Sequence, residues 1–214
     1  MGILGTIGRL GRGKTLRGVM WLYEGYCENE TCFTNLPVKF PHVPIKTPLD
    51  FLKLKKWRFF GDELWALIDN LDSMKNRDSL VTIMCLRSRK QEFSVFYTQQ
   101  YLQVDVRLLF ITDELIRPTC YPYDPERKRK VRPEIMVCER WDGDGKELPS
   151  QIFKNVGAYC DLYDTNEDPY TVQTLLDQRE LKEAVSKALE DEEMREEMAQ
   201  LIKIASLKKK ELPL

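Results

Sequence analysis

Residues 8–15 carry the strongest chemical signal in this sequence, Gly8-Arg9-Leu10-Gly11-Arg12-Gly13-Lys14-Thr15. They match the phosphate-loop pattern G-x-x-x-x-G-K-[ST] at every position. Glycines allow such a loop to turn its backbone N–H groups inward, toward phosphate oxygens. We expect Lys14 to face solvent until it meets the β and γ phosphates of ATP, and Thr15 to bind Mg²⁺ through its hydroxyl. The predicted nucleotide-binding residues are Gly8, Arg9, Leu10, Gly11, Arg12, Gly13, Lys14, Thr15 and Leu16.

A second pair of candidate catalytic residues is Asp62 and Glu63. They follow Trp57-Arg58-Phe59-Phe60-Gly61, which predicts a strand although Arg58 interrupts its apolar run. At the end of that strand, Asp62 would hold Mg²⁺ through water. Glu63 would orient and polarise the water that attacks the γ-phosphate. The alternative is an acidic helix N-terminus, since the apolar residues 64–68 could begin a helix.

Gln99 is a third candidate, at the end of Phe93-Ser94-Val95-Phe96-Tyr97-Thr98-Gln99. This apolar, β-branched and aromatic run predicts a buried strand. If that strand lies beside the phosphate loop, its last residue can contact the γ-phosphate or the attacking water. The amide of Gln99 offers both a donor and an acceptor for this role. Gln100 is the less favoured candidate, and a surface glutamine is the alternative.

These groups need a sheet to bring them together. Ile3, Leu4 and Ile7 predict a short strand before the phosphate loop, and residues 15–23 have the apolar spacing of a helix. Residues 101–112 predict a short helix. Residues 114–117 and 133–141 predict strands that extend the sheet in antiparallel fashion.

The densest basic run of the chain lies between those last two strands and is flanked by Tyr121 and Tyr123. Aromatic and basic side chains together suit nucleic acid. A solvated hairpin tip is the equally weighted alternative. The candidate DNA-binding residues are Arg127, Lys128, Arg129, Lys130 and Arg132.

Residues 171–207 contain neither glycine nor proline and predict amphipathic helices. We therefore divide the chain into an ATPase core, 1–168, with a β-hairpin extension over about 113–165, and a helical appendage, 169–214. Lys208-Lys209-Lys210 is expected to be a frayed cationic end, with DNA contact as the alternative.

The 214 residues suit an α/β domain with an appendage, and the net charge of −1 restricts any nucleic-acid site to a local patch. No apolar run reaches the ~18–20 residues of a membrane span. We expect neither a signal peptide nor an integral membrane segment, and a cytoplasmic location, in the host cytoplasm if the protein is viral. The six cysteines are scattered and are expected to be free thiols.

The order of these motifs resembles the FtsK–HerA superfamily of pumping ATPases. The resemblance rests on residues 8–15, Thr34-Asn35-Leu36-Pro37, Gly61-Asp62-Glu63-Leu64-Trp65, Arg87-Ser88-Arg89-Lys90 and Tyr97-Thr98-Gln99. The second and third of these look like the Zot-type and viral genome-packaging branch. Asp161-Leu162-Tyr163-Asp164-Thr165 resembles archaeal viral and plasmid relatives. Zot proteins of filamentous phages carry a transmembrane segment that is not expected here.

The resemblance covers about residues 1–167. It implies an α/β, RecA-like P-loop NTPase with a mainly parallel sheet, assembled as a ring, expected to be a hexamer. It also implies an arginine donated across the subunit interface into the neighbouring ATP site. Arg89 is the first candidate and Arg87 the second, near the end of a predicted helix over 78–90. The alternative is a solvated basic helix end.

Two functions remain from the sequence. The first is an ATP-hydrolysing motor, stimulated by DNA, that packages viral DNA or transfers plasmid DNA. Its cofactors would be ATP and Mg²⁺, and its partners DNA, further copies of itself, and a capsid or membrane-associated protein. The second is a nucleotide-gated assembly switch, or a Zot-like virion-assembly ATPase, that does not move DNA. The strandedness of the DNA stays open.

Overall fold

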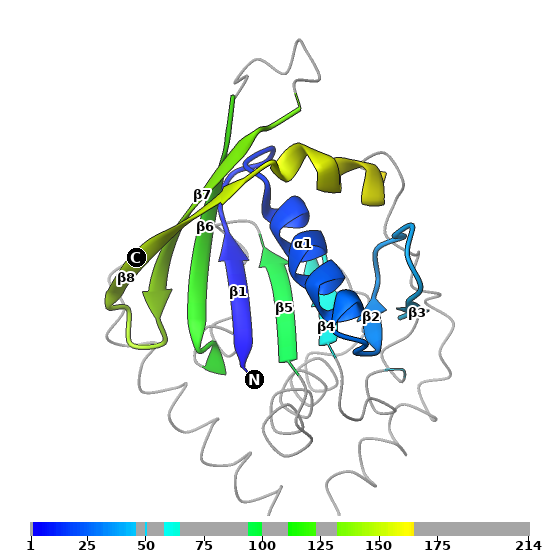
Figure 1. The fold of residues 1–214 in the computed structure, drawn as a ribbon. Helices are drawn as coiled ribbons and strands as arrows, with labels where there is room; N and C mark the ends of the chain where they lie inside the picture. Colours follow the sequence, from blue (N-terminus) through cyan, green and yellow to red (C-terminus); the bar gives the residue numbers. More distant parts are fainter. Residues whose placement is uncertain are drawn as a thin grey trace, which may run out of the picture.

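The computed structural model describes residues 2–45, 50, 58–64, 94–99, 111–122 and 132–164. Within these ranges one sheet has the strand order β3-β2-β4-β5-β1-β6-β7-β8, and helix α1 lies against one of its faces (Figure 1). The elements are β1 Ile3–Ile7, α1 Lys14–Cys27, β2 Cys32–Thr34, β3 Val43–Pro44, β4 Arg58–Gly61, β5 Ser94–Gln99, β6 Glu114–Tyr121, β7 Ile135–Asp142, β8 Glu147–Lys154 and the 3₁₀ helix η2 Val156–Leu162.

The part of the sheet that carries the candidate site is parallel. β1 pairs with β5 on one side and β6 on the other, β4 pairs with β5, and β2 pairs with β4, all in parallel. In this register Ile7 lies opposite Gln99, and Gly61 lies opposite Tyr97. The carboxyl ends of β1, β2, β4 and β5 therefore meet at one edge of the sheet. The predicted α/β class and mainly parallel sheet are confirmed.

Helix α1 fixes the phosphate loop against this sheet. Leu16, Val19 and Met20 belong to a buried cluster that includes Phe60 of β4. Because a Cβ on Gly18 would come within 2.0 Å of the Phe60 ring, only glycine allows the helix to approach the sheet this closely. The strand–loop–helix unit expected from the sequence is thus present, and the fold is an α/β P-loop NTPase fold.

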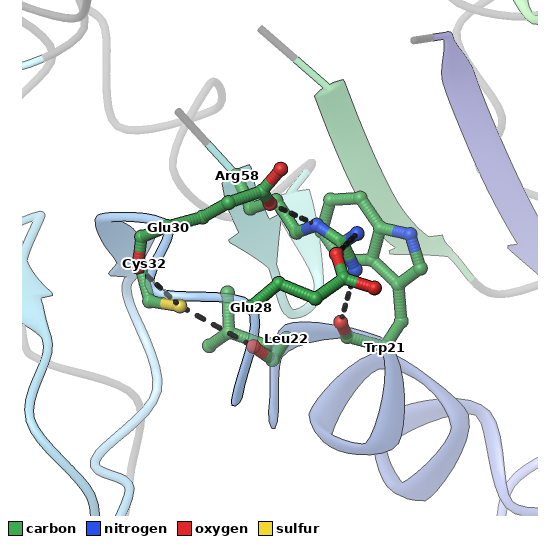
Figure 2. A network of polar contacts seen from close by, with 6 residues as sticks. All are labelled: Trp21, Leu22, Glu28, Glu30, Cys32 and Arg58. Carbon is green, nitrogen blue, oxygen red and sulfur yellow. Dashed lines mark hydrogen bonds and ion pairs between the residues drawn. The ribbon is translucent and has the colours of Figure 1, made fainter. Parts of the chain in front are cut away.

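Arg58, the residue that interrupts the apolar run of β4, has a structural explanation. Its guanidinium lies over the Trp21 ring, 5.1 Å from the ring centre, and donates to the Trp21 carbonyl oxygen at 2.9 Å. It also pairs with Glu28, at 2.8 Å, and with Glu30 (Figure 2). The guanidinium thus reaches the two glutamates that follow α1, and the stem packs on the helix, since a Cβ on Gly25 would lie 2.3 Å from the Arg58 Cδ.

The cysteines in the described ranges are free thiols. Cys27 is exposed, whereas Cys32 is buried and donates to the Leu22 carbonyl oxygen at 3.3 Å (Figure 2). Burial raises the pKa of the Cys32 thiol to about 11. Cys85 lies outside the described residues.

The predicted antiparallel extension is also confirmed: β7 pairs with β6, and β8 pairs with β7. Strand β8 was not predicted. Pro149 lies within it and most of its side chains are exposed, so the usual apolar alternation is missing. In the described part of the sheet β8 is the last strand, and an edge position tolerates proline because one side of the strand needs no N–H donor.

Strand β6 runs past the phosphate loop. It pairs with β1 only from Glu114 to Ile116, so its remaining residues continue beyond the end of β1 (Figure 1). A Cβ on Gly13 would lie 2.4 Å from the Cys120 sulfur. The extension is therefore packed directly against the loop.

Several predictions of the sequence lie outside the described residues. These are the helices over 78–90 and most of 101–112, and the appendage 169–214. None of the helices in the part of the chain that the structure describes combines the length and apolar character needed to traverse a bilayer.

Candidate active site

The phosphate loop has the backbone shape that its glycines predicted. Gly8, Gly11 and Gly13 have φ values of 143°, 77° and 96°. Residues with a Cβ rarely adopt this left-handed region. Gly13 stands immediately before the first turn of α1, which supplies free amides for an anion. At the tip of the loop Leu10 is 52% exposed.

Lys14 differs from the expectation that it faces solvent: it is buried. Its ammonium donates to the carbonyl oxygens of Gly8 at 3.0 Å and Arg9 at 3.3 Å. The physical reason is that the carbonyl oxygens of the loop offer a buried cation the acceptors it needs. The side chain nevertheless lies in the loop, where phosphate oxygens could replace those carbonyls.

The Thr15 hydroxyl and the Asp62 carboxylate lie together, although they come from α1 and from the residue after β4. The hydroxyl donates to the two carboxylate oxygens at 3.0 and 3.2 Å. A hydroxyl and a carboxylate are hard oxygen ligands, which Mg²⁺ accepts together with waters and phosphate oxygens. The residues therefore fit the predicted metal.

Asp62 is 7% exposed, and its ionisation is opposed by its surroundings. Burial raises the pKa of this carboxyl, and the nearby charge of Glu63 acts in the same direction. Hydrogen bonds from Thr98 and Thr15, and the charge of Lys14, lower the pKa but are smaller effects. A divalent cation beside the carboxylate would favour its charged form.

Glu63 lies just after β4, where the chain leaves the sheet. Its φ of 44° is left-handed, a conformation that is uncommon for a residue with a side chain. Its backbone N–H donates to the Thr98 hydroxyl oxygen at 2.8 Å, and that hydroxyl donates to the Asp62 carboxylate at 2.7 Å. Glu63 is half-buried.

Two further residues of this edge had no predicted role. Asn35, just after β2, exchanges hydrogen bonds with the backbone of Asp62, and Thr98 bridges Asp62 and Glu63 as described above. Both residues were visible in the motifs Thr34-Asn35-Leu36-Pro37 and Tyr97-Thr98-Gln99. Their contacts were not, because sequence spacing does not tell which strands are neighbours.

Gln99 is fully buried at the end of β5, opposite the last residue of β1. Neither its amide nitrogen nor its amide oxygen has a hydrogen-bond partner among the described residues. Buried amides are rarely left in this state, so the Gln99 amide is available to bind a further polar group. The contact of Gln99 with phosphate or attacking water stays a prediction.

The remaining predicted residues are not brought to this site by the described structure. The arginine candidates Arg87 and Arg89 lie outside the described residues, as do residues 127–130 of the basic run. Arg132 is described: its side chain is 63% exposed and pairs with Asp161 of η2.

No protein-family model matches this sequence, and no curated protein matches it. Among solved structures, the N-terminal domain of zonular occludens toxin from Neisseria meningitidis is 16% identical, over 76% of this chain and 98% of that one, with a TM-score of 0.49. The flagellar accessory protein FlaH from Methanocaldococcus jannaschii is 10% identical, over 72% of this chain and 84% of that one, also with a TM-score of 0.49.

The genome packaging NTPase B204 from Sulfolobus turreted icosahedral virus 2, in complex with AMPPCP, is 10% identical over 72% of this chain and 97% of that one, with a TM-score of 0.46. The toxin domain and the viral NTPase belong to the two kinds of protein that the motif order resembles.

Proposed function

We propose that this chain is an ATPase that hydrolyses Mg²⁺-bound ATP and uses the energy to move DNA. The observation that carries the ATPase part is the position of five side chains at one edge of the sheet. Lys14 and Thr15 come from the start of α1, Asp62 and Glu63 follow β4, and the unpartnered amide of Gln99 ends β5. Phosphoryl transfer to water needs positioning and charge compensation more than covalent chemistry.

Each side chain has a role in this proposal. The amides of the phosphate loop and the Lys14 ammonium bind the phosphates, and Lys14 exchanges its two loop carbonyls for phosphate oxygens. Thr15 and Asp62 would hold Mg²⁺, which neutralises phosphate charge when bound. Glu63 accepts hydrogen bonding from the attacking water and orients it, and the Gln99 amide contacts that water or the γ-phosphate.

The DNA-moving part rests on the motif order and on the extension. Strands β6 and β7 pass the phosphate loop and lead into the basic run 127–132 with its flanking tyrosines. Cys120 of β6 lies against Gly13, so the extension touches the nucleotide loop itself. In this proposal the DNA is viral DNA being packaged or plasmid DNA being transferred.

One experiment tests both parts. ATP hydrolysis by the full chain is measured with and without single- and double-stranded DNA, for the unaltered protein and for Glu63→Gln. The carboxamide keeps the shape of Glu63 but cannot polarise water, so the rate should fall on the order of a hundredfold or more, with ATP still bound. Hydrolysis at the normal rate by Glu63→Gln would refute the proposed ATPase mechanism.

Stimulation by DNA separates the motor from the nucleotide-gated assembly switch. A motor should hydrolyse ATP faster with DNA, and this gain should shrink when salt screens the basic side chains. ATP hydrolysis that no DNA alters would favour the switch.

The proposed ring has its own test, because the arginine acts across an interface. Arg89→Ala subunits mixed with Glu63→Gln subunits should recover activity, since some interfaces then join an intact Arg89 to an intact Glu63. An arginine that acts within its own subunit allows no such recovery. The same mixture with Arg87→Ala distinguishes the two candidates.

A further inference from the structure

The peptide bond between Asp62 and Glu63 is held from both sides. Its carbonyl oxygen, on Asp62, accepts a hydrogen bond from the Asn35 amide nitrogen at 2.7 Å. Its N–H, on Glu63, donates to the Thr98 hydroxyl oxygen at 2.8 Å. Carbonyl and N–H point in opposite directions across a trans peptide. The strand order agrees, because β4 lies between β2, which leads to Asn35, and β5, which carries Thr98.

Asn35 makes a second bond to the same residue. Its amide oxygen accepts from the Asp62 N–H at 2.8 Å, so both backbone groups of Asp62 bind one side chain. The register of β2 on β4 ends with Thr34 opposite Phe60, and the Asn35 amide thus replaces the backbone partner that β2 no longer supplies. Asn35 is 2% exposed.

The local chain holds Asn35 in place. The Leu36 N–H donates to the Thr34 hydroxyl oxygen at 3.0 Å, which closes a tight turn around Asn35. A buried amide that binds both backbone groups of one residue is a rigid support for that residue.

The held peptide determines where Glu63 points. Glu63 has a φ of 44°, and rotation of the preceding peptide plane would carry its Cβ to a new direction. Left-handed backbone at a residue with a Cβ persists only where surrounding contacts impose it. Here the side-chain bonds from Asn35 and Thr98 to its peptide are such contacts.

We propose that Asn35 is a positioning residue for hydrolysis, which acts by fixing the Asp62–Glu63 peptide so that the Glu63 carboxylate meets the attacking water. This inference rests on the proposed ATPase function. It assigns Asn35 no contact with substrate. Displacement of a reacting group by about 1 Å can cost on the order of a hundredfold in rate.

The main test is Asn35→Asp in the full chain. The ionised carboxylate keeps an acceptor for the Asp62 N–H but has no donor for the Asp62 carbonyl. We expect single-turnover hydrolysis to slow on the order of tenfold to a hundredfold, with little change in the affinity for a fluorescent ATP analogue. Thr98→Val should act in the same direction from the other side of the peptide, whereas Thr98→Ser, which keeps the hydroxyl, should restore the rate.

A double-mutant cycle tests whether Asn35 affects hydrolysis through Glu63. If Asn35 acts through Glu63, Asn35→Asp should slow hydrolysis strongly in the unaltered chain but add little in the Glu63→Gln background. The matched control is Thr112→Val, which removes another buried hydroxyl, bonded to the Tyr97 hydroxyl at 2.7 Å. Thr112 precedes β6, at the amino ends of the parallel strands, whereas Asp62 and Glu63 follow the carboxyl end of β4. Its rate should stay near that of the unaltered chain.

Three results would overturn the inference. They are a normal rate for Asn35→Asp, an equal loss in both backgrounds, and an ATP affinity that falls as much as the rate. Asn35→Ala is measured alongside, and if either Asn35 variant fails to fold, the contrast between Thr98→Val and Thr98→Ser decides. A normal rate for Glu63→Gln would instead remove the proposed function itself, so the two failures are distinguishable.

Discussion

Replacing Gln99 by leucine should make the nucleotide-free protein more stable and less active. The amide is fully buried, and neither of its polar atoms has a partner among the described residues. Leucine has a similar volume and no polar atom, so the substitution removes an unpaired group without opening a large cavity. The same change should remove the contact that we propose for phosphate or attacking water.

The magnitude follows from the burial. An unpaired buried amide costs ~1–3 kcal/mol, and part of this cost returns as stability in Gln99→Leu. A gain of ~1–2 kcal/mol corresponds to a rise of about 2–8 °C in Tm for a chain of this length. Loss of one positioned hydrogen-bond donor should slow hydrolysis on the order of a hundredfold or more.

The assay combines thermal unfolding with ATP hydrolysis. Unfolding is followed without nucleotide and with a non-hydrolysable ATP analogue, whose stabilising effect should shrink in Gln99→Leu. Gln151→Leu is the matched control: Gln151 is exposed on β8, so the same chemical change should leave stability and rate nearly unaltered. A nucleotide-free Gln99→Leu protein that is clearly less stable would show that the amide has a structural partner and refute the reasoning.

The other predictions concern the metal site and the phosphate loop. Because burial raises the pKa of Asp62, acidification should weaken Mg²⁺-dependent ATP binding at a higher pH than the ~4 of an ordinary aspartate, as a pH series of analogue binding would show. The same raised pKa means that protonated Asp62 contributes stability below the unfolded-state pKa, and this contribution is lost as pH rises through the folded-state pKa. Asp62→Asn should therefore raise the free energy of unfolding of the nucleotide-free protein at neutral pH and abolish the Mg²⁺ dependence, and a lower stability for this variant would contradict the argument. Lys14→Ala should abolish hydrolysis and also loosen the phosphate loop, because the carbonyls of Gly8 and Arg9 lose the ammonium that binds them. Faster hydrogen exchange of the loop amides in the nucleotide-free protein would show this loosening. Hydrolysis at the normal rate would disprove the phosphate-loop assignment.

What the sequence determined by itself is local. The glycine spacing of residues 8–13 permits left-handed backbone. Continuous apolar runs identify β1, β4 and β5, and helical apolar spacing identifies α1, because the apolar pattern is a property of each segment. Polar residues at the carboxyl ends of those strands were therefore recognisable as site candidates. Strand β8 was not predicted, because most of its side chains are exposed and it contains a proline, so it has no apolar pattern.

The tertiary structure alone decided which strand ends are neighbours. That β5 lies between β1 and β4 places Gln99 and Thr98 beside the phosphate loop and Asp62, and that β2 flanks β4 gives Asn35 its two bonds to Asp62. The inward turn of Lys14 is of the same kind, since it depends on carbonyls that only the folded loop presents. Pairing between distant segments is set by packing and hydrogen bonding of the whole sheet, and no single segment contains that information.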